Sequence, residues 1–300
     1  MSKAKYLFFL FFCLFAKSFL FADSNSVKIT TSQTITLGAI QGITEFLPVS
    51  STGHMILANE KIFSVSQNEN TRKKAIDSYM VCIQLGTILT LLLFYRKQIC
   101  RIFWGCLGKD RIGFKLGFNV GIAFIPAGLI GFLLDGFIQA YFYNSLWISI
   151  ALIAGGFVIL NLKKINRNRC ACKDIYDLSL RSAWVIGLFQ VIALWPGFSR
   201  SLATILGGIW IGFSLIQAVH FSFLLGLLTS TVATLYKFLK HSDVLFQYID
   251  GTSAWLGIGI AFILGMLTIK IFFKFLQKHD LTMFGYYRIF IGIILLLCLK

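Results

Sequence analysis

Two short stretches of the chain carry polar and charged side chains inside otherwise apolar sequence. The first spans residues 38–57 and contains Gln41, Glu45, Ser50, Ser51, Thr52 and His54. The second spans residues 187–207 and contains Ser199, Arg200, Ser201 and Thr204. Charged groups at membrane depth are costly unless they line a cavity or pair with one another, so both sets are candidates for function.

Arg200 and Glu45 together indicate a site for a phosphate group and a metal ion. A planar guanidinium suits phosphate, and nearby hydroxyls and the backbone N–H groups at a helix start add donors. Carboxylate and amide oxygens, here those of Glu45 and Gln41, are ligands that Mg²⁺ or Ca²⁺ accepts. If the two stretches meet, we expect a phosphate to bind between Arg200 and the cluster around Glu45.

Ser51 and His54 could supply the reacting groups. They are three residues apart, on the segment that follows Pro48. A serine hydroxyl can act as a nucleophile or as a phosphate ligand. A histidine can move protons near neutral pH.

Each of these side chains also has a structural interpretation. Glu45 could be a buried structural acid, His54 a core histidine with its hydrogen bonds satisfied, and Arg200 the ion-pair partner that neutralises Glu45. The serines could be small residues at helix contacts, which is common in membranes. The combination of an acid, an imidazole and a guanidinium on two interrupted stretches favours a catalytic site.

The composition predicts an all-α polytopic membrane protein. Of 300 residues, 57% are hydrophobic and 13% are charged, about half the charged fraction of a soluble domain. The apolar runs are continuous rather than alternating, which argues against a β-barrel. The net charge of +16 indicates basic cytoplasmic loops that contact anionic lipids. Nucleic acid is a poor candidate for a partner because the basic residues lie in short loops.

The two polar stretches must be positioned by interrupted helices. Pro48 breaks the segment 34–58, and Pro196-Gly197 breaks the segment 179–213. A crossing helix needs about 20 apolar residues, so each half is too short to cross alone, and a re-entrant helical hairpin fits better. Three spans are predicted after each hairpin, at 76–95, 116–134 and 145–162, and at 217–238, 253–275 and 282–299.

A unit of one hairpin and three spans therefore occurs twice, at 34–162 and at 179–299, within a single membrane domain that covers 34–300. Because three is an odd number, the second copy should be inverted across the membrane, and such repeats place their site near the midplane. A gapped alignment pairs Gly38, Gln41 and Ser51 with Gly187, Gln190 and Ser199.

The positive-inside rule orients the chain. The basic loops 96–115 and 163–173 should be cytoplasmic and the loop 135–144 outside, so the first hairpin should dip in from the outer face. The cluster of Arg72, Lys73 and Lys74 argues against this orientation. Residues 1–22 are predicted to be a signal sequence or an uncleaved N-terminal anchor, followed by a polar linker at 23–33.

The motifs QGITEFLPVSSTGH at 41–54 and PGFSRSLAT at 196–204 resemble those of the bacitracin-resistance family of undecaprenyl-diphosphate phosphatases. The string IQLGTIL at 83–89 is also similar, and the resemblance covers roughly residues 34–299. It implies hydrolysis of undecaprenyl (polyprenyl) diphosphate to the monophosphate and inorganic phosphate at the outer face of the bacterial inner membrane. That reaction recycles the cell-wall lipid carrier, confers bacitracin resistance and requires a divalent metal.

The resemblance also assigns roles to residues. It implies Glu45, Ser51, His54 and Arg200 as catalytic, with Ser51 and His54 as nucleophile and acid/base pair. It implies Glu45 and Gln41 at the metal. The predicted substrate-binding set is Gln41, Ser50, Thr52, Ser199, Ser201 and Thr204. Position 41 is Gln where many family members have Glu, so we expect weaker metal affinity there.

One other class of function fits the same architecture. Inverted repeats with midplane hairpins also occur in transporters, so a lipid-phosphate flippase or an anion transporter is the alternative. A purely structural role would not require Glu45, His54 and Arg200 inside the membrane. The sequence leaves open the metal, Mg²⁺ or Ca²⁺, the prenyl chain length and the oligomeric state, with a homodimer among the options.

Overall fold

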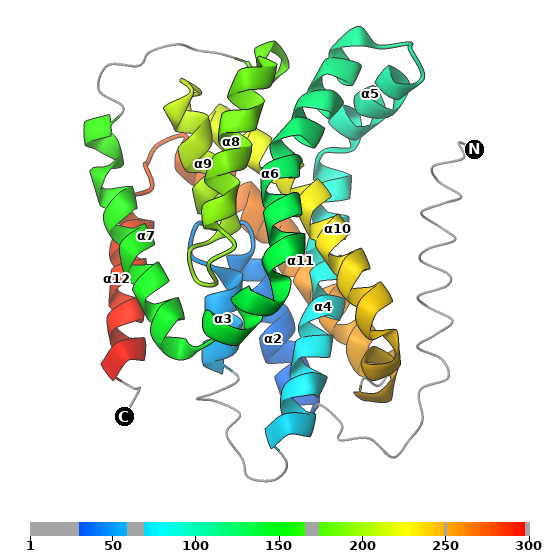
Figure 1. Ribbon diagram of the computed structural model, residues 1–300, viewed down its shortest axis with the longest axis vertical. Helices are drawn as coiled ribbons and strands as arrows, with labels where there is room; N and C mark the ends of the chain where they lie inside the picture. Colours follow the sequence, from blue (N-terminus) through cyan, green and yellow to red (C-terminus); the bar gives the residue numbers. More distant parts are fainter. Residues whose placement is uncertain (1–29, 59–68, 166–173, 249–250, 298–300) are drawn as a thin grey trace.

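The computed structural model describes residues 30–58, 69–165, 174–248 and 251–297, and the regular elements within them are all helices (Figure 1). This confirms the all-α prediction. The predicted leader at 1–22 and most of the linker lie outside the described residues. The elements in chain order are α2 (Thr31–Thr44), α3 (Ser51–Leu57), α4 (Glu69–Phe94), α5 (Arg96–Cys106), α6 (Arg111–Tyr141), α7 (Ser145–Ile165), η2 (Ile175–Asp177), α8 (Leu180–Ile192), α9 (Arg200–Trp210), α10 (Leu215–Tyr248), α11 (Gly251–Leu276) and α12 (Thr282–Leu297).

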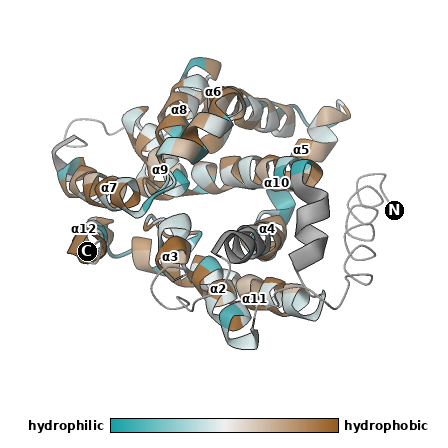
Figure 2. Ribbon diagram, turned by 60° about the horizontal axis from the view of Figure 1, so that its bottom comes forward, coloured by the Kyte–Doolittle hydropathy of each residue, from teal (hydrophilic) through white to brown (hydrophobic). Residues whose placement is uncertain are grey.

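The described helices include four that are long and apolar enough to cross a membrane, namely α6, α7, α10 and α11. The end of α4 and α5 form a fifth candidate, bent by 78°, and α12 is a shorter apolar helix. Figure 2 shows hydrophobic colouring over much of α6, α7 and α8. Their exposed side chains include Leu129, Phe132, Leu133, Phe157 and Leu188, as lipid contact requires. The chain is a multi-pass membrane protein.

Two segments predicted to be loops are helical. Residues 96–106 form α5, because apolar side chains such as Ile99 and Ile102 recur between the basic ones and pack on the core. Residues 135–141 continue α6, where Lys240 of α10 neutralises Asp135 at 2.8 Å. Both segments were predicted to be loops because they lie between the apolar spans and carry charged residues, and in the structure packing or pairing satisfies these charges within a helix.

The corner between α5 and α6 is held by Asp110. Its carboxylate accepts a hydrogen bond from the Gly113 N–H at 2.9 Å, which caps α6, and another from Arg101 Nε at 2.9 Å. The hydrogen bond from Arg101 lowers the pKa of Asp110, which lies between α5 and α6 and outside the candidate spans.

Each polar stretch forms a helical hairpin, as predicted: α2 and α3 in the first, α8 and α9 in the second. The first hairpin packs on α11 and the second on α6, so each contacts a span from the other half of the chain. Gly38 makes room for the backbone of Gly257, and Gly187 makes room for the backbone of Ala123. The alignment of Gly38 with Gly187 therefore has a physical basis, which is close helix approach.

The two hairpins enter from opposite ends of the bundle. In Figure 1, α2 rises from the lower end and α8 descends from the upper end, and the turns after them overlap at mid-height. A hydrogen bond of 3.2 Å from Ser201 Oγ to the Leu47 carbonyl shows that the start of α9 contacts the turn after α2. The inversion of the two halves across a membrane stays a prediction.

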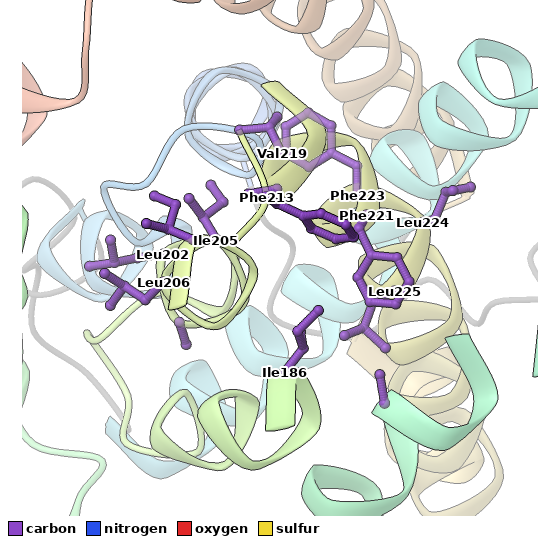
Figure 3. Packing of buried hydrophobic residues seen from close by; sticks show 14 of the residues in the cluster. Ile186, Leu202, Ile205, Leu206, Phe213, Val219, Phe221, Phe223, Leu224 and Leu225 are labelled. Carbon is purple, nitrogen blue, oxygen red and sulfur yellow. The ribbon is translucent and has the colours of Figure 1, made fainter. Parts of the chain in front are cut away.

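A buried apolar cluster holds the second hairpin against α10 (Figure 3). Ile186 of α8 and Leu202 of α9 are fully buried, as are Val219 and Leu225 of α10. This dry packing fixes the start of α9, where Arg200 lies.

Candidate active site

The hairpin turns place three reactive side chains at helix ends. Glu45 directly follows α2, Ser51 is the first residue of α3, and Arg200 is the first residue of α9. Ser50 and Ser199 are the residues just before α3 and α9, with φ of 71° and 78°. Among the described residues, these two are the non-glycine residues with positive φ. Such backbone costs about 1–3 kcal/mol and concentrates at functional sites.

These cap residues correct the predicted repeat alignment. Each serine side chain accepts a hydrogen bond from a backbone N–H of the helix that it precedes, from Gly53 for Ser50 and from Leu202 for Ser199. Ser199 therefore corresponds to Ser50, not to Ser51. The counterpart of Ser51 is Arg200, so equivalent positions of the two hairpins carry the hydroxyl and the guanidinium.

Arg200 and Glu45 form the centre of the site. Arg200 Nη2 donates to Glu45 Oε1 at 2.6 Å, and the exposed fractions of the two side chains are 21% and 9%. Arg200 Nη1 is buried and has no hydrogen-bond partner among the described residues. Gly226 of α10 makes room for the guanidinium, because a Cβ there would collide with Nη1. The guanidinium therefore has donors left for an anion.

The second oxygen of Glu45 organises two further groups. Oε2 accepts hydrogen bonds from Ser51 Oγ at 2.7 Å and from Gln41 Nε2 at 3.3 Å. Gln41 Nε2 also donates to Thr87 Oγ1 of α4, while Gln41 Oε1 is buried without a partner among the described residues. The structure thus brings Gln41, Glu45, Ser51 and Arg200 into one hydrogen-bonded group.

This group lines a cavity of about 590 Å³. Ser50, Thr52, Ser199 and Ser201 line it as well, so eight of the ten predicted site residues surround one space. A cavity lined by Glu45 and Arg200 argues against a purely structural pair, which would need no empty space beside it.

The other two predicted residues, Thr204 and His54, do not line this cavity. Thr204 is buried, and its Oγ1 lies 2.6 Å from Ser222 Oγ of α10, so it joins α9 to α10. The ring of His54 faces α12 instead: Nδ1 lies 2.8 Å from the Ser50 carbonyl oxygen, and Nε2 lies 2.7 Å from the Tyr287 hydroxyl. Ser51 is hydrogen bonded to Glu45 rather than to His54.

The oxygen atoms of Glu45 and Gln41 suit a hard divalent cation whose remaining ligands are water and substrate phosphate. No group of three His, Cys, Asp or Glu side chains suited to a metal occurs in the described part of the chain. The Glu45 carboxylate and the unpartnered Gln41 Oε1 are oxygen ligands of neighbouring residues, although the atom of Gln41 that contacts Glu45 is Nε2. Mg²⁺ is commonly held by one or two carboxylates, water and substrate phosphates, so these residues fit such an ion.

Arg288 of α12 is a residue that the sequence analysis missed. Its side chain is fully buried and donates to five backbone carbonyls at 2.9–3.3 Å. Pro48 belongs to the first hairpin turn, Gly197 and Phe198 belong to the second, and Ala151 and Leu152 belong to α7. Gly155 of α7 leaves the space that the guanidinium fills. One side chain therefore joins the two turns that carry the site.

Fold and site together define a multi-pass helical membrane protein whose charged site lies where two interrupted helices meet. Residues 34–294 match the family described as "Bacitracin resistance protein BacA". The chain belongs to this family.

Curated relatives agree with this assignment. The chain is 38% identical to the "Undecaprenyl-diphosphatase" of Clostridium tetani over 263 residues, covering 88% of this chain and 94% of that protein. It is 40% identical to "Undecaprenyl-diphosphatase 1" of Clostridioides difficile, covering 87% and 93%. It is 36% identical to the "Undecaprenyl-diphosphatase" of Aquifex aeolicus, covering 89% of this chain and 97% of that protein.

Proposed function

We propose that this protein hydrolyses undecaprenyl diphosphate to undecaprenyl phosphate and inorganic phosphate. The observation that carries the proposal is the Arg200–Glu45 contact of 2.6 Å on the wall of a cavity lined by both hairpins. The names of the curated relatives supply the substrate class. The reaction would recycle the lipid carrier of cell-wall synthesis and so confer resistance to bacitracin.

Arg200 is the proposed diphosphate ligand. Its Nη1 group makes no hydrogen bond with any described residue, and a buried donor without a partner costs about 1–3 kcal/mol. A phosphate oxygen would satisfy this donor after a small rotation of the guanidinium. The positive charge would also stabilise the charge that accumulates on the leaving phosphate oxygens.

Ser51 is the proposed nucleophile and Glu45 its base. The Ser51 hydroxyl already donates to Glu45 Oε2 at 2.7 Å, within the range needed for proton transfer. Ser51 Oγ would attack the terminal phosphorus, and the bond to the bridging oxygen would break to release the lipid monophosphate. Water would then hydrolyse the phosphoserine. In the rival route, Glu45 or His54 activates water directly and Ser51 only binds the substrate.

Glu45 and Gln41 are the residues that would hold a divalent cation. A bound Mg²⁺ or Ca²⁺ supplies Lewis-acid charge to phosphate oxygens. Because position 41 is an amide, Glu45 carries the negative charge of this pair alone. Ser50, Thr52, Ser199 and Ser201 complete the proposed substrate-binding wall of the cavity.

The proposed location is the bacterial inner membrane with the cavity open to the periplasm. The orientation rests on the basic residues of α5 and of the segment after α7, which would be cytoplasmic by the positive-inside rule. The polyprenyl chain would remain in lipid while the diphosphate enters between the hairpin turns.

Phosphate release in detergent separates this proposal from a flippase or anion transporter. Detergent micelles have no two compartments, so transport is not measurable there, whereas hydrolysis proceeds. We expect the purified protein to release one inorganic phosphate per undecaprenyl diphosphate, and a chelator to lower the rate. Absence of phosphate release under these conditions would favour the transporter class.

Replacing Ser51 with alanine distinguishes the two chemical routes. We expect Ser51→Ala to lose at least about 10²-fold in kcat, because a nucleophile cannot be replaced by a methyl group. Rapid quenching of the wild-type protein with substrate labelled in the terminal phosphate should trap label on Ser51. Near-normal turnover of Ser51→Ala would instead establish the direct attack of water.

A further inference from the structure

The cavity has a second polar region, formed by α6, the residues that follow it and α10. Its side chains are Asp135, Gln139, Tyr143, Tyr236 and Lys237. The chemistry proposed above uses none of them. They share the cavity with Glu45 and Arg200, so a ligand in that cavity can reach both regions.

The described residues that line the cavity carry two negative and two positive charges, and Lys240 adds a further positive charge beside it. Two acidic residues line it, and each has an ion-pair partner: Arg200 for Glu45 at 2.6 Å and Lys240 for Asp135 at 2.8 Å. Lys237 also lines it, and the structure gives it no ion pair with any described residue. Lys237 does lie near enough to Asp135 to act on it electrostatically. With Lys240 counted, these five charged residues carry one cation in excess, although Lys240 itself is not among the described residues that line the cavity.

The polar side chains near Lys237 are hydrogen bonded to one another. Asp135 accepts hydrogen bonds from Gln139 Nε2 at 2.7 Å and from Tyr236 OH at 3.4 Å, besides Lys240 Nζ. Lys240 Nζ also donates to Tyr236 OH at 3.0 Å. This network satisfies the Asp135 carboxylate. The ammonium of Lys237 is not part of it and can still donate hydrogen bonds to an anion.

Helix geometry places Lys237 at a distance from the catalytic group. Lys237 follows Gly226, the glycine against Arg200, by eleven residues on α10. Eleven residues of α-helix make about three turns and about 16 Å, so the two positions share one face of α10. Lys237 therefore lies about three helical turns along α10 from the residue that contacts Arg200.

We propose that Lys237 forms an outer anion-binding site in this cavity, whose ligand is a phosphate group. The choice of this ligand rests on the proposed function. The phosphate group belongs either to the lipid diphosphate as it enters or to inorganic phosphate as it leaves. Lys237 is exposed, and a cation beside a cavity concentrates anions and speeds their association, an effect that salt screens.

Kinetics of Lys237→Gln test the proposal and identify the source of the phosphate. If the entering head group binds there, kcat/KM should fall about five- to tenfold with kcat unchanged, and its salt dependence should flatten. If leaving phosphate binds there, the inhibition constant of inorganic phosphate should rise by a similar factor. Lys237→Arg should restore either property, and Lys274→Gln, an exposed lysine of α11 outside the cavity, should change neither.

A binding measurement provides a readout that needs no turnover. In an Arg200→Gln protein, ³¹P NMR titration with inorganic phosphate should still show binding, and the added Lys237→Gln change should abolish it. Unchanged kinetics in Lys237→Gln, or unchanged phosphate binding in the double variant, would overturn the outer site. A wild-type protein without phosphatase activity would overturn the proposed function, while the NMR titration would still decide the role of Lys237.

Discussion

Replacing Arg200 with lysine is expected to lower kcat/KM for undecaprenyl diphosphate by about 10²–10³-fold, the usual cost of removing one charge-stabilising donor. Arg200 donates to Glu45 through Nη2, while Nη1, the proposed donor to the substrate, has no hydrogen-bond partner among the described residues. A lysine ammonium is a point charge and cannot serve both partners with this planar geometry. Steady-state phosphate release from purified Arg200→Lys measures the effect, and full activity would remove Arg200 from the chemistry.

Gly226→Ala tests the same position without touching a charged residue. The new Cβ would occupy the space of the Arg200 guanidinium and push it from Glu45. Alanine favours helix over glycine by about 1 kcal/mol, so the change carries no intrinsic helix penalty. We expect activity to fall at least tenfold. Gly259→Ala on α11, where a Cβ meets nothing within 4 Å, is the matched control and should keep wild-type activity.

Replacing Arg288 with methionine is expected to be the most destabilising single change. It removes the Arg288 donor from five backbone carbonyls; those of Ala151 and Leu152 keep their bonds within α7, whereas each turn carbonyl left unpaired costs about 1–3 kcal/mol. Because three of these carbonyls lie in the hairpin turns, activity should fall at temperatures where the helices remain folded. Thermal unfolding by circular dichroism and phosphate release, measured side by side, check both effects.

The outcome that contradicts this role of Arg288 is a methionine variant with wild-type stability and wild-type kcat. Gly155→Ala offers a milder companion, since its Cβ would press on the guanidinium from α7. A positioning role predicts that this variant loses kcat more than folding stability. Equal losses in both would indicate a role in the fold alone.

The architecture and most of the site could be predicted from the sequence because their signals are local. Pro48 and Pro196 mark breaks in apolar runs, and the hairpins α2–α3 and α8–α9 form around them. A charged side chain in such a run requires a partner, and Glu45 and Arg200 supply each other. Composition and spacing carry this information without knowledge of the packing.

Hydrogen-bond partners within the site could not be predicted in the same way. Spacing placed Ser51 and His54 together, but Ser51 donates to Glu45 while the His54 ring contacts Tyr287 of α12. The strained backbone at Ser50 turns the start of α3 and decides which way each side chain points. That dihedral angle depends on the tertiary contacts of the turn.

Arg288 lies between these two cases. A charged residue within the apolar run 282–299 meets the same criterion that identified Arg200, so its burial was foreseeable. Its partners were not, because they are backbone carbonyls of α7 and the two turns, and a carbonyl leaves no mark in the sequence. The proposed role of Lys237 could not be predicted either, because it depends on the ion pair between Asp135 and Lys240, which forms only in the folded protein.

The most direct test of a catalytic Glu45–Arg200 site is phosphate release from undecaprenyl diphosphate in detergent, with wild-type protein beside Glu45→Gln. The amide keeps the shape of Glu45 but loses the charge that faces Arg200 and the acceptor strength that Ser51 Oγ requires. We expect stoichiometric release of inorganic phosphate by the wild type and a loss of at least about 10²-fold in the variant. Release by Glu45→Gln at the wild-type rate would contradict a catalytic role for this pair.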